Sequence, residues 1–359
     1  MMKRFFSVFL AIILITTLFG CKKAEVPETT TETTQTTTTT TQPVTQAQPK
    51  DINPLTGSKK FNPKAIGRRP VAISIENQPQ ARPQWGITTP DIIIEGETEG
   101  GISRMLWLYA DYSKVPDKVG PVRSARPSFV VCTELFDSIF IHWGGSHNNK
   151  NYKGGYTYIK KHGVDDIDGM KGGKLYGRDK TRSVAIEHRG ILYGNRIPSV
   201  IKEKKIRKKL NEKKFSTLYF NETQQNAGKR AAPKVKCRFS SVSGKRTFTY
   251  SKKNKKYHTT DWEKDVAFKN LILLYDETKY ITVPYKGSTT TYLNYQSLCN
   301  GKGEGTGYYA SNGTVRKIYW KIKKKKLYLR DKNNKNIKIN KGKSYIGLAS
   351  SNHGGKIAF

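Results

Sequence analysis

Short apolar runs separated by turn-forming residues limit the folds that are open to this chain. "PVAISIEN" (70–77), "DIIIEG" (91–96) and "RMLWLYADY" (104–112) are rich in β-branched and aromatic residues, and such runs predict buried strands. "PSFVVCTELF" (127–136) places proline at a first helical position and predicts a helix, whereas "DSIFIHW" (137–143) predicts a further strand. Strands interrupted by a helix indicate an α+β layer arrangement.

The pattern changes from helical to β near Phe215. "PSVIKEKKIRKKLNEKKF" (198–215) has apolar residues at helical spacing under a dense lysine face, which predicts a helix that closes or links a first domain. "RTFTYSKKNKKYHTT" (246–260) predicts a hairpin and "FKNLILLY" (268–275) a buried strand. Residues 305–349 alternate apolar with basic side chains, which predicts an antiparallel meander with its lysines in solvent.

About 310 residues follow the first 50, and a prior of roughly 150 residues per domain predicts two domains. The change of pattern places them at 51–215, an N-terminal α+β domain, and 216–359, a smaller and basic β-rich domain.

Several blocks of the sequence carry a resemblance to a known family. "NPLTG" (53–57), "KVGPVRSARPSF" (118–129), "FDSIFIHWGGS" (136–146) and "GKGEGTGYYASNGTVRKIYWK" (301–321) resemble blocks of the DUF3048 family of YerB-like bacterial lipoproteins. The resemblance extends over residues 53–350. It implies a lipid-anchored surface protein with a three-layer ββα sandwich as its N-terminal domain and a mainly antiparallel β C-terminal domain. It implies no reaction.

The stretch "GPVRSARPSF" (120–129) contains a candidate anion site. Arg123 and Arg126 stand just before the predicted helix start at Pro127, beside the hydroxyls of Ser124 and Ser128. Helix N-termini favour anions, and arginine binds phosphate or carboxylate in a bidentate manner. The alternative is structural: these arginines pair with Glu95, Glu97 or Glu99 of "EGETEGGISR", which ends in Arg104, and lock two layers together.

His142 ends a predicted strand before Gly144, Gly145 and Ser146, a position suited to acid–base chemistry. Its neighbour Trp143 offers a ring for stacking. The alternative is a histidine that serves the core or fastens a loop. Neither a Gly-x-Ser-x-Gly elbow nor an HExxH motif accompanies it.

Asp165, Asp166 and Asp168 lie close together in "VDDIDG", but their spacing does not match an EF-hand loop. A turn capped by aspartate side chains is the simpler interpretation, and a calcium site is the alternative, since three close carboxylates before a glycine can bind a hard cation. We expect neither a metal nor a cofactor. "LYGRDKTR" follows with an adjacent Arg and Asp. The candidate ligand-binding residues are Glu95, Glu99, Arg104, Arg123, Ser124, Arg126, Ser128, His142, Arg178 and Asp179.

The N-terminus predicts export and a lipid anchor. Met-Met-Lys-Arg precedes an apolar run from Phe5 to Phe19, which is shorter than the roughly 20 residues of a membrane span and typical of a signal peptide (1–20). Gly20-Cys21 resembles the cleavage site of bacterial lipoproteins, so we expect Cys21 to be lipidated on the outer face of the cytoplasmic membrane. An uncleaved anchor is the alternative. Residues 21–50, with eleven threonines between Thr29 and Thr41, are a solvated tether.

The formal net charge of +37 is concentrated in the C-terminal part. Residues 201–359 contain 38 Lys and Arg against 10 Asp and Glu, a net charge of +28. Such a charge often indicates nucleic acid, but export excludes that partner, and no nucleic-acid motif is present. Anionic wall polymers or lipid headgroups are the expected partners. A plain lysine-rich surface is the alternative.

Apart from Cys21, the chain has three cysteines, Cys132, Cys237 and Cys299, and an odd number leaves at least one free thiol. The lipid anchor, the tether and the basic C-terminal part favour a binding lipoprotein over an enzyme. The alternative is an extracellular hydrolase or transferase acting on a phosphate- or carboxylate-bearing envelope substrate. No feature of the sequence identifies a protein partner.

Overall fold

The β-branched runs of the first half form five neighbouring strands of a large mixed sheet. The computed structural model describes residues 51–285 and 287–359. The order is β2-β3-β1-β4-β5, in which β3 is antiparallel to its neighbours and the other four strands are parallel to one another. Their bounds are β1 Val71–Glu76, β2 Ile92–Glu99, β3 Ile102–Tyr109, β4 Ile139–His142 and β5 Asp166–Asp168. The first four confirm the predicted strands, whereas β5 was predicted as a turn.

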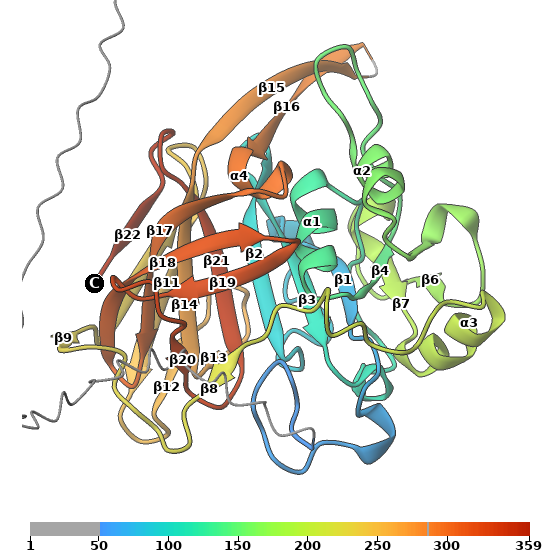
Figure 1. Ribbon diagram of the computed structural model, residues 1–359. Helices are drawn as coiled ribbons and strands as arrows, with labels where there is room; N and C mark the ends of the chain where they lie inside the picture. Colours follow the sequence, from blue (N-terminus) through green and yellow to red (C-terminus); the bar gives the residue numbers. More distant parts are fainter. Residues whose placement is uncertain (1–50, 286) are drawn as a thin grey trace, which may run out of the picture. The chain divides into compact units, whose positions relative to one another are not determined.

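The second half continues the same sheet (Figure 1). Strand β21 (Ser344–Ser350) lies between β14 (Asn270–Asp276) and β2 and is parallel to both. Beyond β14 follow β17 (Gly303–Ser311), β18 (Thr314–Lys323) and β19 (Lys326–Arg330), each antiparallel to its neighbour.

The meander predicted for residues 305–349 is thus confirmed for β17 to β19 and wrong for its last segment. All seven residues of β21 are buried. A strand that is covered on both faces does not need the alternating pattern of a half-exposed meander strand. Because it fills the space between β14 and β2, β21 joins the two halves of the chain into one sheet.

A second sheet of five strands has the order β13-β12-β11-β10-β22. Its strands are β10 (Lys234–Arg238), β11 (Lys245–Ser251), β12 (Lys256–Thr259), β13 (Val266–Phe268) and β22 (Lys356–Ala358), and β11 with β12 forms the predicted hairpin. The remaining strands are β6 (Tyr176–Arg178), β7 (Gly190–Leu192), β8 (Tyr219–Phe220), β9 (Arg230–Ala231), β15 (Thr278–Tyr285), β16 (Ser288–Tyr295) and β20 (Lys338–Ile339).

The helices are short. They are α1 (Pro127–Leu135), α2 (Gly155–His162), α3 (Ile197–Glu203) and α4 (Gln296–Cys299). The 3₁₀ turns are η1 (Pro63–Ala65), η2 (Pro79–Ala81), η3 (Tyr112–Lys114), η4 (Gly169–Lys171), η5 (Ile186–Arg189) and η6 (Gly194–Arg196). Helix α1 begins at Pro127 as predicted. Within the described residues, no helix is long and apolar enough to cross a membrane.

The helix predicted for 198–215 is wrong beyond Glu203, where α3 ends. Lys205 has a positive φ of 54°, and the following lysines run as extended backbone against residues 67–69. Arg69 N–H donates to the Lys208 carbonyl and Leu210 N–H to the Gly67 carbonyl. Backbone pairing with a distant segment therefore replaces the helical hydrogen bonds that the local spacing favoured.

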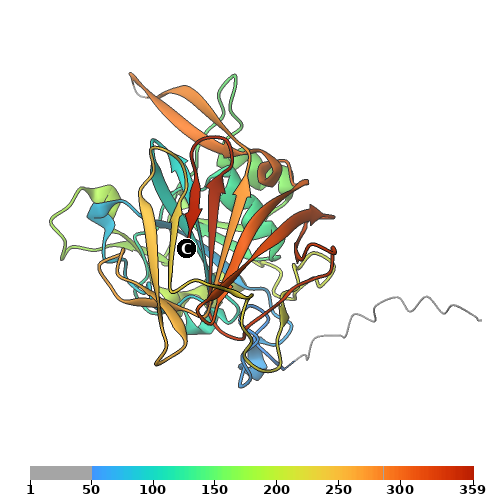
Figure 2. The ribbon, with the colours of Figure 1, turned by 90° about the vertical axis from the view of Figure 1, so that its left-hand side faces the viewer.

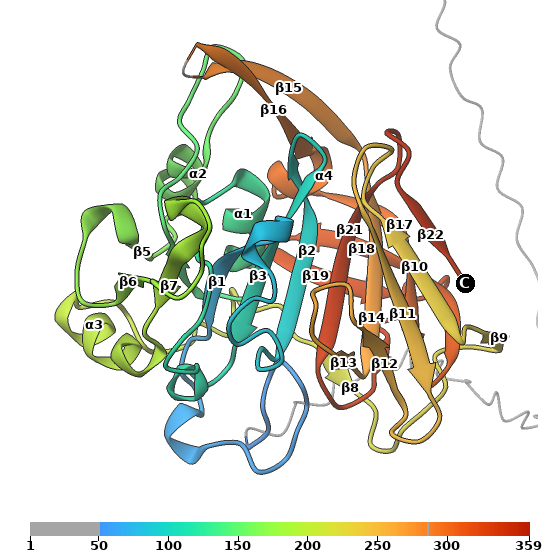
Figure 3. The same ribbon diagram turned by 180° about the vertical axis from the view of Figure 1, so that it is seen from behind.

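The large sheet has a different cover on each face, which confirms the three-layer ββα arrangement. Ile92 and Ile94 point into the core beneath α1 and α4, and Ile93 points into the core beneath the second sheet. In Figure 1 the helices α1 and α4 lie in front of the sheet, and in Figure 3 strands β10 and β11 lie in front. Figure 2 shows the yellow strands of the second sheet beside the orange and red strands of the large one.

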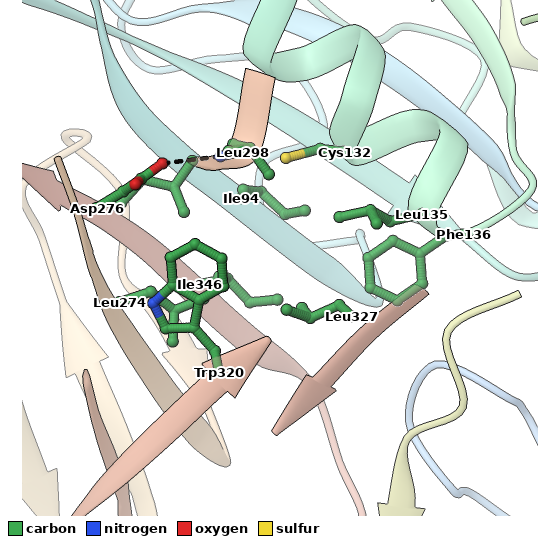
Figure 4. A pocket seen from close by; sticks show the side chains of 11 residues that line it. Ile94, Cys132, Leu135, Phe136, Leu274, Asp276, Leu298, Trp320, Leu327 and Ile346 are labelled. Carbon is green, nitrogen blue, oxygen red and sulfur yellow. Dashed lines mark hydrogen bonds between the residues drawn. The ribbon is translucent and has the colours of Figure 1, made fainter. Parts of the chain in front are cut away.

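The core beneath the helices contains a cavity of about 20 Å³, lined by Cys132, Trp320, Leu327 and other apolar side chains together with Asp276 (Figure 4). This volume accommodates about one water molecule, so the cavity is too small for a ligand. Cys132, Cys237 and Cys299 are separate buried thiols. Burial raises the pKa of Cys132 to about 12, so this thiol packs as a small apolar group rather than reacting.

Candidate functional site

Four parallel strands end at one edge of the large sheet, and charged side chains gather there. Strands β2, β1, β4 and β5 end at Glu99, Glu76, His142 and Asp168. The segment that leads into α1 crosses this edge, because Arg123 N–H donates to the Ser74 carbonyl and Trp143 N–H to the Arg123 carbonyl. Ligands of open α/β sheets bind at the carboxyl ends of parallel strands. We call this region the carboxyl edge.

Glu99 holds two of the predicted arginines. Its Oε1 accepts from Arg104 Nη2 at 2.7 Å and from Arg126 Nη2 at 2.7 Å, and its Oε2 accepts from Arg126 Nε at 2.8 Å. The side chains of Glu99 and Arg126 are only 16% and 11% exposed. Burial opposes ionisation of Glu99, but the two guanidinium groups outweigh it and hold its pKa well below the usual range.

This arrangement lowers the pKa of Arg104. Burial and the nearby Arg126 guanidinium lower the pKa of Arg104 to about 10, although Glu99 raises it. Two cations thus share one carboxylate. For Arg126, the structure shows the internal pairing that was the structural alternative, with Glu99 as the partner; Arg104 joins the same carboxylate.

The ring of Tyr292 also covers the Arg126 side chain. Its guanidinium carbon lies 5.4 Å from the centre of the Tyr292 ring on β16, and Tyr292 stacks on Tyr152 at 4.3 Å. Ser128, in the first turn of α1, is buried. The N-terminus of α1 is therefore packed under the β15–β16 hairpin, and the exposed cations of the carboxyl edge lie elsewhere.

Arg123 and Arg178 are the more accessible arginines of the edge. The Arg123 side chain is 24% exposed, with its Nε 3.4 Å from Glu76 Oε1. Arg123 Nη1 donates to the Glu187 carbonyl at 3.3 Å, and Arg178 Nη1 donates to the Ile186 carbonyl at 2.6 Å. Because these two carbonyls are consecutive in η5, the two guanidinium groups lie close together. Burial and the neighbouring Arg123 and Arg189 lower the pKa of Arg178.

Trp143 lies beneath this cluster. The Arg178 guanidinium carbon is 4.1 Å from the centre of the Trp143 ring, and Tyr176 packs on the same ring at 5.1 Å. A Cβ at Gly169 would approach the ring to 2.8 Å. The indole therefore supports Arg178 from within the fold.

Sequence reasoning missed the buried pair of Glu76 and His188. Glu76 Oε1 lies 2.9 Å from His188 Nδ1. Burial raises the pKa of Glu76, although Arg123 and His188 oppose this. Glu76 Oε2 is buried and has no hydrogen-bond partner among the described residues. The glutamate that ends the apolar run "PVAISIEN" was a usable signal, because buried glutamates need partners; nothing in the sequence pointed to His188.

His142 is fully buried at the end of β4. Its Nδ1 donates to the Gly144 carbonyl at 2.7 Å, and its Nε2 lies 3.2 Å from Asp166 Oδ2. Asp168 accepts from the Gly144 N–H at 2.7 Å and caps η4. These contacts fasten the loop after β4. Across residues 51–285 and 287–359, His, Cys, Asp and Glu form no cluster that could hold a metal ion.

The other predicted residues are placed as follows. Glu95 does not meet Arg123 or Arg126; it is buried against Arg246 of β11, whose Nη2 donates to Oε1 at 2.7 Å. Asp179 pairs with Lys118 and accepts from Thr181 Oγ1 at 2.7 Å. Ser124 Oγ donates to the Trp143 carbonyl at 3.1 Å. The structure thus gathers Arg104, Arg123, Arg126, Arg178 and Glu99 at the carboxyl edge and places Glu95 between the two sheets.

Comparison with known proteins gives a family and one solved fold. Residues 55–216 match the model described as "Protein of unknown function (DUF3048) N-terminal domain", and residues 233–346 match the corresponding C-terminal domain. The "Putative lipoprotein YerB" of Bacillus subtilis (strain 168) is 50% identical over 97 residues, which are 27% of this chain and 28% of that relative. The matched stretch thus spans little more than a quarter of the relative's length.

The crystal structure of the YerB protein from Bacillus subtilis is similar at a TM-score of 0.67 and 27% identity, covering 86% of this chain and 99% of that one. The two-domain family and the sandwich fold that the sequence blocks implied are both confirmed.

Proposed function

Because this chain carries both the N-terminal and the C-terminal domain of the DUF3048 family, we propose that it is an exported lipoprotein that binds an anionic ligand. Cys21 anchors it to the outer face of the cytoplasmic membrane, and residues 21–50 hold the folded body away from the lipid. The name of the Bacillus relative and the signal pattern support the anchor. Cys21 and the tether lie outside the described residues.

The excess of arginine at the carboxyl edge is the observation that carries the binding proposal. Arg104 and Arg126 share the single carboxylate of Glu99, and Arg123 contacts Glu76, which His188 also contacts. Arg178 donates to a backbone carbonyl, and Arg189 Nε is buried without a hydrogen-bond partner among the described residues. Glu187 adds a third carboxylate beside Arg123 and Arg178. Five arginines thus face three glutamates around Glu99, Glu76 and η5, and a site whose cations outnumber its carboxylates attracts an anion.

The chemistry of the ligand follows from the side chains. Planar guanidinium groups match the oxygen geometry of phosphate and carboxylate. Arg123 and Arg178 both donate hydrogen bonds to carbonyls of η5 and are accessible to solvent. A phosphate or carboxylate group of an envelope molecule therefore binds between their guanidinium groups. The basic C-terminal part adds a second, less specific attraction to anionic envelope material.

Calorimetric titration of the full-length protein with inorganic phosphate tests the site. Arg123→Gln and Arg178→Gln should each weaken binding about tenfold or more, since a hydrogen bond to a charged group contributes roughly 1.5–3 kcal/mol. Arg196→Gln is the matched control, because Arg196 also lies over an aromatic ring, at 4.3 Å from Tyr193, and donates to a backbone carbonyl. Equal weakening in all three variants would reject the site.

The Glu76–His188 contact is the observation that favours the alternative, a hydrolase or transferase. A carboxylate that holds one ring nitrogen of a histidine orients the other for proton transfer. The same samples report on this alternative when a phosphate ester replaces phosphate. If the ester is recovered intact, the protein only binds it. If wild type forms product and His188→Gln forms none, the enzyme is favoured.

A further inference from the structure

Among the residues that the structure describes, none forms a second layer over one strip of the large sheet. Phe359, at the end of the second sheet, packs on Tyr308 of β17 at 4.8 Å. On the same face, Ala310 and Val315 lie in the core between the sheets. Side chains at alternate positions of a strand share a face, so Thr306 of β17 and Tyr319 of β18 continue this face beyond its cover.

The strand register places basic and aromatic side chains together on this uncovered strip. Tyr319 lies opposite Thr306 and Arg330, and Lys321 lies opposite Glu304 and Tyr328. Lys317, Lys321 and Lys323 alternate with inward-facing Ile318, Trp320 and Ile322 along β18. We call the outward set the ring-lysine face: Lys317, Tyr319, Lys321, Lys323, Tyr328 and Arg330.

The cations and the rings of this face touch one another. Lys317 Nζ lies 5.6 Å from the centre of the Tyr319 ring, and the Arg330 guanidinium carbon lies 5.1 Å from the centre of the Tyr328 ring. Tyr319 is 38% exposed, one of the more exposed large apolar side chains of the body. Tyrosine is enriched at binding interfaces, because its ring is apolar while its hydroxyl can remain in water.

A groove runs along the ring-lysine face. Its volume is about 560 Å³, and Tyr319, Lys321, Lys323, Arg330 and Lys332 line it with the acidic Glu304 and Asp331. Glu304 Oε2 lies 2.8 Å from Lys321 Nζ, and Asp331 accepts from the backbone of its own turn. Lys323 and Lys332 lie in solvent. The groove therefore keeps a positive charge after its internal ion pair is counted.

We propose that the ring-lysine face binds a polymer in which phosphate groups alternate with polyol or sugar units. Along β18, Lys317, Tyr319 and Lys321 follow one another at steps of about 6.6 Å, so cation, ring and cation repeat in line. The cations attract phosphates, and the rings pack against the C–H faces of the intervening units. This inference rests on the proposed attraction of the basic C-terminal part to envelope polymers and assigns that attraction to one surface.

The shape of the face favours a polymer chain over a membrane. A groove of this volume encloses a flexible chain, whereas a lipid surface is contacted by protruding lysines. Lysines of that second kind exist at the β11–β12 turn, where Lys252 and Lys253 are exposed. The two sets of lysines therefore provide an internal comparison.

Binding of full-length protein to poly(glycerol phosphate) of defined length tests the inference, with inorganic polyphosphate and phosphatidylglycerol vesicles as comparison probes. The double variant Lys321→Gln/Lys323→Gln should bind the polyol polymer about tenfold more weakly and with a shallower salt dependence. Lys252→Gln/Lys253→Gln, which removes the same charge, should bind within twofold of wild type. Tyr319→Leu should weaken the polyol polymer and leave polyphosphate unchanged.

The possible results distinguish the ring-lysine face, the polyol or sugar units, a lipid surface and the general electrostatic attraction. Equal losses in the two lysine double variants would overturn the face while leaving the electrostatic attraction intact. No effect of Tyr319→Leu would overturn the assignment of polyol or sugar units. Wild-type protein that binds vesicles but neither polymer would overturn the inference in favour of a lipid surface. Failure to bind any of the probes would remove the proposed attraction itself.

Discussion

The pair of arginines around Glu99 makes a stability prediction that can be worked out from the structure. Glu99→Gln keeps the shape of the side chain and removes its charge. Three hydrogen bonds from Arg104 and Arg126 to this carboxylate, at 2.7, 2.7 and 2.8 Å, are weakened together. The two guanidinium groups then face each other, buried and without their shared anion.

Removing one partner from a buried ion pair costs about 3–5 kcal/mol. For a body of about 300 residues, each kcal/mol lowers the melting temperature by roughly 2 °C, so we expect Glu99→Gln to melt about 6–10 °C below wild type. Urea denaturation at pH 7 measures the free energy directly. Glu304→Gln is the control, because the Glu304–Lys321 pair is exposed and its loss should leave stability unchanged.

The pH dependence gives a second readout of the same contact. Because the pKa of Glu99 is lower in the folded protein than its ordinary value, its contribution is fully present above about pH 4.3. The contribution is lost as the pH falls through the lower, folded pKa. The stabilities of wild type and Glu99→Gln should therefore differ at pH 7 and converge only in stronger acid. Equal stabilities at pH 7 would refute the reasoning.

Two further predictions concern other parts of the chain. Arg246→Met should lower the free energy of unfolding by about 3–5 kcal/mol in urea denaturation, because it leaves the fully buried Glu95 without its cation; the double variant with Glu95→Leu should recover much of this loss. Cys21→Ala should move the protein from the membrane fraction to the soluble exported fraction, and unchanged membrane retention would favour an uncleaved anchor.

The strands of the N-terminal half were predictable because their apolar runs are local and continuous. The start of α1 was equally clear, since Pro127 fits the first helical position. The end of α3 was not predictable, because the lysines after Glu203 pair with residues 67–69, which are more than 130 positions away. The position of β21 was hidden for the same reason: its pattern shows burial, but not which strands it joins.

The candidate site was predictable in its residue types and only partly in its pairs. Glu99 was one of three glutamates in reach of the arginines by sequence, and simple alternation along β2 would place Glu95, Glu97 and Glu99 on one face. A register shift between Glu97 and Glu99 breaks that alternation in the structure. What separates them is the neighbour opposite each one. Glu95 meets Arg246 from the second sheet, whereas Glu99 meets Arg104 and Arg126. These contacts form only when the sheets and helices pack together, so the sequence of β2 alone does not predict them.

The shared strand β2 connects the two halves of the chain in the fold. It carries Glu99 to the carboxyl edge and Glu95 to the second sheet, and it pairs with β21 along residues Ile92 to Gly96. Strand β21 of the C-terminal half thus supports β2, the strand that carries Glu99 to the arginine cluster. An anion at the carboxyl edge and a polymer on the ring-lysine face would contact opposite ends of one continuous sheet order, from β5 to β19. The two proposed sites share no side chain, so the variants that test one of them leave the other unchanged.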